Sequence, residues 1–210
     1  MAGTGRWVFR LLGWRCTGRT PEHRKFVIIA APHTSNWDGF FLLLAAAMLE
    51  LEFSFFGKHT LFRGPLGWFL RRMGGIPLDR SRHQSFVSQA VSWFESREKF
   101  AIGVAPEGTR RLTAGWKTGF YYIALQARIP IYLGYIDYAR KEAGILPRVL
   151  TPTGDIDKDF AELRSLYEPL AARHPDRKAP VIPLRASRED TKGPIRTAGP
   201  DVTDRGNSSS

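Results

Sequence analysis

The stretch that decides the fold, residues 26–38, reads Phe-Val-Ile-Ile-Ala-Ala-Pro-His-Thr-Ser-Asn-Trp-Asp. Its first six residues are apolar and rich in β-branched side chains, which favours a buried strand. Residues 39–49 follow with many Leu and Ala side chains and indicate a buried helix. The stretch therefore predicts a strand-to-helix turn, a position at which α/β proteins commonly place their chemistry.

His33 and Asp38 are the candidate catalytic residues of this turn. Residues five apart do not face each other on a regular helix, so these two side chains meet only if the chain turns between them. Ser35, Asn36 and Asp38 are all favoured N-cap residues, so we expect the helix to begin inside the stretch. Asp38 can then hold one imidazole nitrogen and leave the other free as a general base. The alternative is a structural histidine followed by a capping aspartate.

The composition bounds the kind of protein and its partners. A chain of 210 residues suffices for one domain with a substantial core. The net charge of +11 and the pI near 10.2 predict an anionic partner: nucleic acid, an acidic carrier or an anionic membrane surface. A single cysteine excludes an internal disulfide framework and fits a reducing compartment.

No apolar run reaches the roughly 18–20 residues that a membrane-spanning helix needs. Residues 6–15 read Arg-Trp-Val-Phe-Arg-Leu-Leu-Gly-Trp-Arg, and their arginines argue against a secretory signal. Trp residues interspersed with Arg suit the headgroup zone of a bilayer, so we expect a short amphipathic helix on the cytoplasmic face of a membrane containing anionic lipid. The alternative is a helix that packs on the domain and keeps its arginines in solvent.

Strand and helix patterns alternate along the chain, which predicts a single α/β domain with a mixed, largely parallel central sheet flanked by helices. We expect the N-terminal basic, aromatic segment over residues 1–20, the globular domain over 21–185 and a disordered tail over 186–210. Besides the first strand and helix, the pattern predicts strands within 52–58, 74–80, 100–105 and 129–136, and helices within 64–73, 84–96, 116–127 and 157–172.

Polar clusters follow three of these strands, at His33, at Asp79-Arg80 and at residues 107–110. Because the carboxyl ends of parallel strands meet at one end of a sheet, we expect the three clusters to converge on one crevice.

The chain resembles the lysophosphatidate acyltransferase family, the glycerolipid acyltransferases marked by a His-x4-Asp motif. That motif is similar to residues 33–38, and the other blocks of the family resemble Gly-Ile-Pro-Leu-Asp-Arg at 75–80, Pro-Glu-Gly-Thr-Arg at 106–110 and Ile-Pro-Ile-Tyr-Leu at 129–133. Lys58 and Lys117 resemble two lysines that flank these blocks. The chain departs from the family at Pro77-Leu78, where an aromatic-aliphatic pair is common, and in having no long N-terminal membrane helix.

The resemblance implies an O-acyltransferase that moves a fatty acyl group from a thioester to a hydroxyl. His33 would be the general base and Asp38 its orienting partner. The remaining implied residues bind substrate. Arg80 and Arg110 hold the acceptor phosphate, and Lys58 and Lys117 are secondary phosphate ligands or solvated surface lysines. Glu107 positions an arginine or a substrate hydroxyl, Gly108 permits close backbone approach, and Thr109 donates through its hydroxyl. Neither a metal nor a cofactor is implied, since acyl-CoA or acyl-carrier protein enters as the donor substrate.

The leading hypothesis is acylation of lysophosphatidate to phosphatidate in phospholipid biosynthesis. A second hypothesis keeps the chemistry but takes another lysolipid or an amino-acid lipid as acceptor. A non-catalytic lipid-binding or nucleic-acid-binding module is a distant third, because the chain carries no recognisable nucleic-acid-binding motif.

Overall fold

The computed structural model describes residues 7, 9–72, 74–78 and 86–184, and its centre is one seven-stranded sheet. The strand order is β1-β8-β7-β2-β5-β3-β4, and every neighbouring pair is parallel except β7 with β8. The expected mixed, largely parallel sheet is therefore confirmed. The strands are β1 Arg15–Thr17, β2 Lys25–Ala31, β3 Ser54–Lys58, β4 Gly75–Leu78, β5 Phe100–Val104, β7 Ile131–Asp137 and β8 Glu142–Leu150, and β6 Trp116–Lys117 pairs with β9 Pro183–Leu184 in a separate ribbon.

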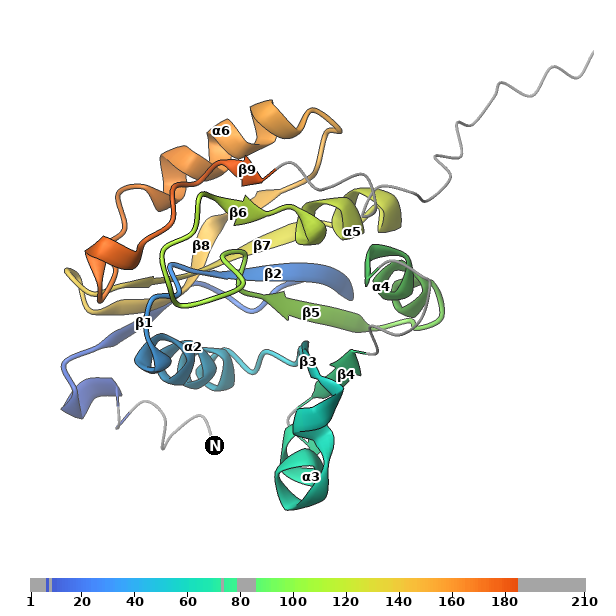
Figure 1. Cartoon of the computed structure of the whole chain (residues 1–210). Helices are drawn as coiled ribbons and strands as arrows, with labels where there is room; N and C mark the ends of the chain where they lie inside the picture. Colours follow the sequence, from blue (N-terminus) through green and yellow to red (C-terminus); the bar gives the residue numbers. More distant parts are fainter. Residues whose placement is uncertain (1–6, 8, 73, 79–85, 185–210) are drawn as a thin grey trace, which may run out of the picture.

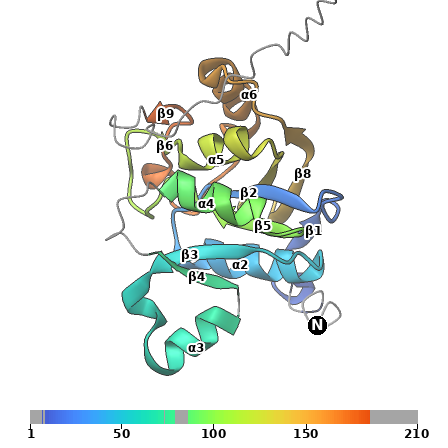
Figure 2. The ribbon, with the colours of Figure 1, turned by 90° about the vertical axis from the view of Figure 1, so that its right-hand side faces the viewer.

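Helices cover both faces of the sheet (Figure 1). Helix α2 (Asn36–Met48) lies on one face, and helices α4 (Phe86–Glu95), α5 (Gly119–Ala127) and α6 (Ile156–Tyr167) lie on the other. Helix α3 (Gly64–Arg72) projects away from the sheet beside β3 and β4, as Figure 2 shows from a second direction. The short 3-10 turns η1 (His59–Phe62) and η2 (Pro175–Arg177) complete the assigned elements.

Strand β2 carries the core on both of its faces. Val27, Ile29 and Ala31 are fully buried in the cluster that includes α4, α5 and α6. Phe26 and Ile28 point to the opposite face, where they pack with residues from the segment after α2. This alternation follows from the two-residue period of a strand and explains why almost every residue of the run is apolar.

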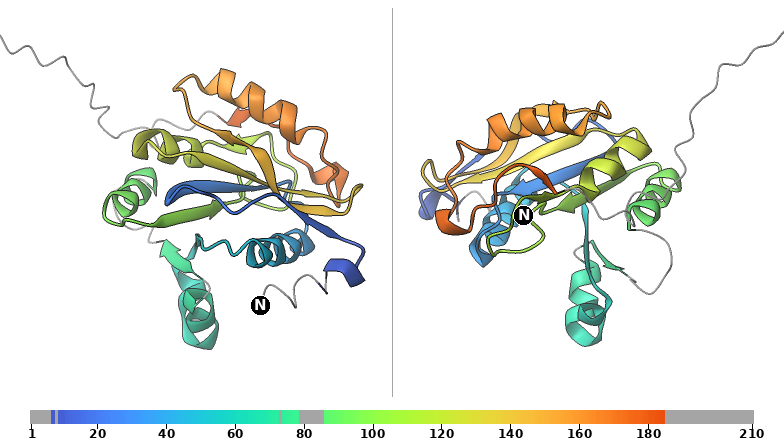
Figure 3. Two further views of the ribbon diagram at one scale, coloured as in Figure 1. Left: turned by 180° about the vertical axis from the view of Figure 1, so that it is seen from behind. Right: turned by 45° about the horizontal axis from the view of Figure 1, so that its top comes forward.

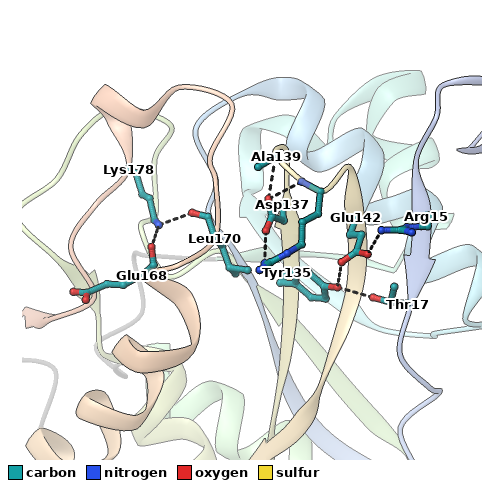
Figure 4. A network of polar contacts seen from close by, with 10 residues as sticks. Arg15, Thr17, Tyr135, Asp137, Ala139, Glu142, Glu168, Leu170 and Lys178 are labelled. Carbon is teal, nitrogen blue, oxygen red and sulfur yellow. Dashed lines mark hydrogen bonds and ion pairs between the residues drawn. The ribbon is translucent and has the colours of Figure 1, made fainter.

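The sequence prediction missed β1 and β8, which form one side of the sheet. Tyr135 ties these strands to β7, because its hydroxyl lies 2.7 Å from the Thr17 hydroxyl and donates to Glu142 at 3.3 Å (Figure 4). Arg15 donates to the same Glu142 carboxylate at 2.8 Å. Residues 15–17 thus belong to the sheet of the domain.

Residues 116 and 117 were expected at the start of a helix, and this was wrong. Trp116 donates its backbone N–H to Ile182, and Lys117 donates its own to Pro106, so both residues are held as strand β6. Helix α5 begins only at Gly119, after Thr118.

The N-terminal segment packs on the domain, which was the second alternative considered for it. Phe9, in a helical turn, and Trp14 are buried against Phe41 of α2, so the segment packs on the domain. Trp7 and Leu11 are 68% and 82% exposed on the same turn. The turn lies on the α2 side of the sheet, as Figure 3 shows from behind. Within the described residues, no helix has both the length and the apolarity to cross a bilayer. The expected tail over 186–210 lies outside the described residues.

Candidate active site

The turn between β2 and α2 forms as the capping residues predicted. Ser35 is the N-cap of α2, and its hydroxyl accepts a hydrogen bond from the Trp37 N–H at 3.2 Å. Asp38 is the third helical residue and completes a capping box, because its Oδ2 accepts hydrogen bonds from the backbone N–H groups of Ser35 and Thr34. His33 therefore lies before the helix, with its imidazole over the first turn: a Cβ added at Gly39 would lie 3.8 Å from His33 Cε1.

The hydrogen bond expected between Asp38 and the His33 imidazole is not formed in this arrangement. Asp38 Oδ2 is occupied by the backbone, and Oδ1 accepts a hydrogen bond from the Tyr138 hydroxyl at 2.7 Å. His33 Nδ1 is buried and has no hydrogen-bond partner among the described residues. Burial lowers the pKa of His33, and the charge of Asp38 opposes this effect without a hydrogen bond between them.

His33 and Glu107 come together at the carboxyl ends of β2 and β5, as the strand pattern predicted. The two strands are parallel neighbours, and the His33 N–H donates to Glu107 Oε1 at 2.9 Å. Glu107 Oε2 is buried without a hydrogen-bond partner among the described residues. Burial raises the pKa of Glu107 to about 7, against the opposing effects of its hydrogen bonds and of Lys178. Glu107 thus changes charge close to neutral pH.

A crevice of about 460 Å³ opens in front of His33. Arg110 lies at its rim and is exposed, so its guanidinium is available to an anionic ligand. Burial lowers the pKa of the His33 imidazole, the charge of Asp38 raises it, and Arg110 lowers it further. His33 is consequently neutral at pH 7, the state a general base requires. The lining comprises His33, Phe56, Phe86, Gly103, Val104, Ala105, Gly108, Thr109 and Arg110.

The loop after β5 brings Lys117 next to the crevice. Gly108 adopts a φ of +67°, and a Cβ there would lie 2.8 Å from Lys117 Cε. This close approach and the left-handed conformation both favour glycine at this position. Thr109 is exposed beside it. The structure thus groups the predicted loop residues with His33, while the Lys117 side chain lies against Gly108 and does not line the crevice.

Two further predicted ligands, Lys58 and Arg80, stay predictions. Lys58 is the last residue of β3, so its backbone lies at the same end of the sheet. Arg80 lies outside the described residues. Among the residues that are described, no three His, Cys, Asp or Glu side chains are grouped as a metal ion would need.

A second groove, of about 480 Å³, lies at the far end of α2. Phe26, Phe53 and Phe100 line it, together with the basic side chains Arg24 and Lys99. Neither His33 nor the loop after β5 contributes to its lining, so it is not the candidate active site.

Tyr138 is the site residue that the sequence prediction missed. It follows β7 and lies 100 residues from Asp38 along the chain, outside the motif blocks. A polar aromatic residue directly after a buried strand at the carboxyl end of the sheet is the signal that could have indicated it.

The fold and the crevice define a class of protein: an α/β domain with a neutral imidazole, a buried carboxylate and an exposed arginine at the carboxyl ends of two parallel strands. Residues 14–135 match the model of the Acyltransferase family, and the chain belongs to this family.

Two curated relatives are both named 1-acyl-sn-glycerol-3-phosphate acyltransferase. The protein from Saccharomyces cerevisiae is 33% identical over 116 residues, which are 51% of this chain and 37% of the relative. The protein from Streptococcus pneumoniae is 28% identical over 117 residues, 55% of this chain and 43% of the relative. The matches therefore span about two fifths of the length of these relatives.

A solved structure supports the fold independently. The 1-acyl-sn-glycerophosphate (LPA) acyltransferase PlsC from Thermotoga maritima superposes with a TM-score of 0.52 at 18% identity, and the match covers 77% of this chain and 72% of that one.

Proposed function

We propose that the protein is an O-acyltransferase that transfers a fatty acyl group from an acyl thioester to the free hydroxyl of lysophosphatidate, giving phosphatidate for phospholipid synthesis. The observation that carries the proposal is the neutral, half-buried His33 in a crevice rimmed by Arg110, in a chain of the Acyltransferase family. The names of the two curated relatives support lysophosphatidate as the acceptor.

His33 removes the proton from the acceptor hydroxyl as its oxygen attacks the thioester carbonyl carbon. Because Nδ1 is buried, Nε2 is the nitrogen that takes this proton. The charge of Asp38 favours the tautomer with the proton on Nδ1 and stabilises the imidazolium that forms. The new C–O bond forms, the C–S bond breaks, and His33 passes the proton to the departing thiolate. Here the substrate supplies the nucleophile that a serine hydrolase would supply itself.

Arg110 binds the acceptor phosphate, since a guanidinium matches two phosphate oxygens. Thr109 adds a hydroxyl donor at the rim, and Gly108 lets the backbone approach the ligand closely. Arg80, Lys58 and Lys117 remain candidates for further phosphate contacts. The donor is acyl-CoA or acyl-carrier protein, both of which are anionic and complement a chain of net charge +11.

We also propose that the protein binds the cytoplasmic surface of an anionic membrane through its α2 side. Large apolar side chains are exposed there on three elements, the N-terminal turn, α2 and α3, which lie on one side of the sheet in Figures 1 and 3. Exposed arginines accompany them on the N-terminal turn and on α3. Apolar side chains with interspersed arginines are typical of a surface that binds anionic lipid. We call this surface the apolar face; its residues are Trp7, Leu11, Leu12, Trp37, Phe40, Leu43 and Trp68.

The test is acylation of lysophosphatidate in vesicles with acyl-CoA and, separately, acyl-carrier protein, beside a panel of other lysolipids. We expect transfer to lysophosphatidate at the highest kcat/KM. In Arg110→Gln, the KM for lysophosphatidate should rise roughly tenfold through loss of a charge-assisted contact. Arg111→Gln is the matched control, because Arg111 is the exposed neighbour that does not line the crevice. A folded protein that acylates another lysolipid in preference would refute the acceptor assignment, and one that acylates none would refute the activity.

A further inference from the structure

Among the described residues, four groups donate hydrogen bonds to Asp38, and none of them is its motif partner. The backbone N–H groups of Thr34 and Ser35 and the Thr34 hydroxyl donate to Oδ2, and the Tyr138 hydroxyl donates to Oδ1 at 2.7 Å. Asp38 is completely buried, so these donors and nearby charges compensate its charge in place of water. Meanwhile His33 Nδ1, also buried, has no partner among the described residues. The Tyr138 hydroxyl thus occupies an oxygen that the imidazole could otherwise use.

The ring of Tyr138 is fixed by its neighbours. Trp14 meets it edge-on, with ring centroids 5.0 Å apart, and Trp14 in turn stacks on Phe41 of α2 at 4.0 Å. The Arg173 guanidinium lies 5.9 Å from the ring centroid of Tyr138. Burial, and next the hydrogen bond to Asp38, raise the pKa of Tyr138, so its hydroxyl stays protonated and donates. This packing allows the hydroxyl little freedom to leave Asp38.

We propose that Tyr138 is a positioning residue for the His33–Asp38 pair: by donating to Asp38 Oδ1, it keeps the carboxylate on the N-terminus of α2 and away from the resting imidazole. The inference deepens the proposed acyl transfer and rests on it for its kinetic consequence. Tyr138 lies outside the motif blocks, and it reaches the site through its hydrogen bond to Asp38.

Removal of the hydroxyl changes the balance of charges around His33. Arg110 and Glu107, both from the loop after β5, face His33, and Arg173 lies over the ring of Tyr138. Arg110 and Glu107 are unaltered in Tyr138→Phe, whereas Arg173 loses its contact with the hydroxyl and Asp38 loses the donor that offsets part of its charge. The carboxylate then attracts the imidazolium more strongly and can accept a hydrogen bond from Nδ1, so protonated His33 is stabilised.

The experiment measures the titration of His33 by NMR in isotope-labelled protein, with its signal among the five histidines assigned by its loss in His33→Ala. In Tyr138→Phe we expect the His33 midpoint to rise by roughly 0.5–1 pH unit. The rate of acyl transfer should fall by roughly three- to tenfold on the acid side of the profile and stay within about twofold on the basic side. Tyr135→Phe is the matched control: it removes a buried hydroxyl that contacts Thr17 and Glu142 and not the site (Figure 4).

A shift in Tyr138→Phe with an unchanged midpoint in Tyr135→Phe supports the proposal. An unchanged midpoint in folded Tyr138→Phe overturns it, and so does an equal shift in both variants. Tyr138→Met, which also lacks the hydroxyl, serves as a second variant if the first does not fold. The NMR titration of His33 needs no substrate. An absence of acyl transfer by the wild type would therefore refute the proposed function, while the titration would still test the role of Tyr138.

Discussion

Trp37 and Asp38 are neighbours in the first turn of α2, yet Trp37 is 51% exposed and Asp38 is completely buried. Each reverses the usual preference of its residue type. The same contrast separates two regions of the molecule. The carboxyl ends of β2 and β5 bury polar groups such as Asp38 and Glu107, whereas the apolar face exposes tryptophan and leucine to solvent.

Burial of carboxyl groups is energetically unfavourable in the first region, and exposure of apolar side chains to water is unfavourable in the second. This difference suggests different roles for the two regions. Buried carboxyl groups are unfavourable unless hydrogen bonds or charges compensate them, so the site holds its charges with backbone donors and Tyr138. Exposed indole rings are unfavourable in water but favourable at a lipid headgroup layer. Helix α2 joins the regions, because its N-terminus supplies Asp38 and its outer side supplies Trp37, Phe40 and Leu43. The comparison teaches that one helix contributes both a buried carboxylate at the candidate site and exposed apolar side chains on the apolar face.

Asp38→Asn tests the buried region and has the largest expected effect of the three changes considered next. The amide still accepts hydrogen bonds from backbone N–H groups, so folding survives, but the charge that stabilises protonated His33 is lost. We expect kcat to fall by about 10³-fold and the acid limb of the rate profile to move to lower pH. A rate within threefold of wild type would mean that Asp38 is only a helix cap.

Glu107→Gln tests the cost of burying a carboxyl group. In the unfolded chain Glu107 ionises near its ordinary value of 4.5, and in the folded protein only near 7. The unfolded state therefore loses its proton first, so stability from this group is complete below pH 4.5 and is lost as the pH rises to 7. Above pH 7 the variant should be more stable than wild type by up to about 3 kcal/mol in urea unfolding, and it should gain nothing at pH 4.

The control for this prediction is Glu52→Gln, because Glu52 is an exposed carboxylate paired with Lys99. Its substitution should leave the pH dependence of stability between 5 and 8 almost unchanged. If Glu107→Gln behaves in the same way, the Glu107 carboxyl group is already ionised at low pH and our description of its burial is incorrect.

Trp68→Ser tests the exposed region and has the smallest expected effect. Trp68 is 70% exposed on α3, away from the crevice, so its loss should leave folding intact. We expect binding to anionic vesicles to weaken by roughly tenfold in a sedimentation assay, from the loss of one interfacial indole. Ile182→Ser, beside β9 on the opposite side of the sheet, should bind as wild type does. Equal vesicle binding by wild type and Trp68→Ser would exclude α3 from the contact.

The sequence predicted those helices and strands that are marked by contiguous apolar runs or capping residues. The apolar run of β2, the capping residues of α2 and the strand preceding Glu107 each appear as contiguous signals, and parallel pairing of β2 with β5 then brings His33 to Glu107. Strand β8 was missed because its buried run, residues 143–145, is short and contains a glycine, and because exposed Pro147 and Arg148 interrupt its second half. Its place is set by antiparallel pairing with β7, a tertiary contact that residue spacing alone does not encode.

The site was predicted where a motif is contiguous and missed where it depends on distant packing. The spacing of His33 and Asp38 suggested a direct hydrogen bond, but it could not reveal that Tyr138 competes for the same carboxylate. Likewise the strong effect of burial on Glu107 depends on its enclosure within the fold and has no local sequence signal. Both the Tyr138–Asp38 hydrogen bond and the burial of Glu107 arise from tertiary packing, so they can be seen only in the folded chain.

The most direct test of the central claim compares thioester-dependent acylation of lysophosphatidate by wild type and by His33→Ala, both shown to be folded. His174→Ala is the matched control, since its backbone N–H donates to Thr34 while its side chain does not line the crevice. We predict that His33→Ala loses roughly 10²–10⁴-fold in kcat and that His174→Ala retains the wild-type rate. Equal rates in wild type and His33→Ala would contradict the claim that His33 is the general base.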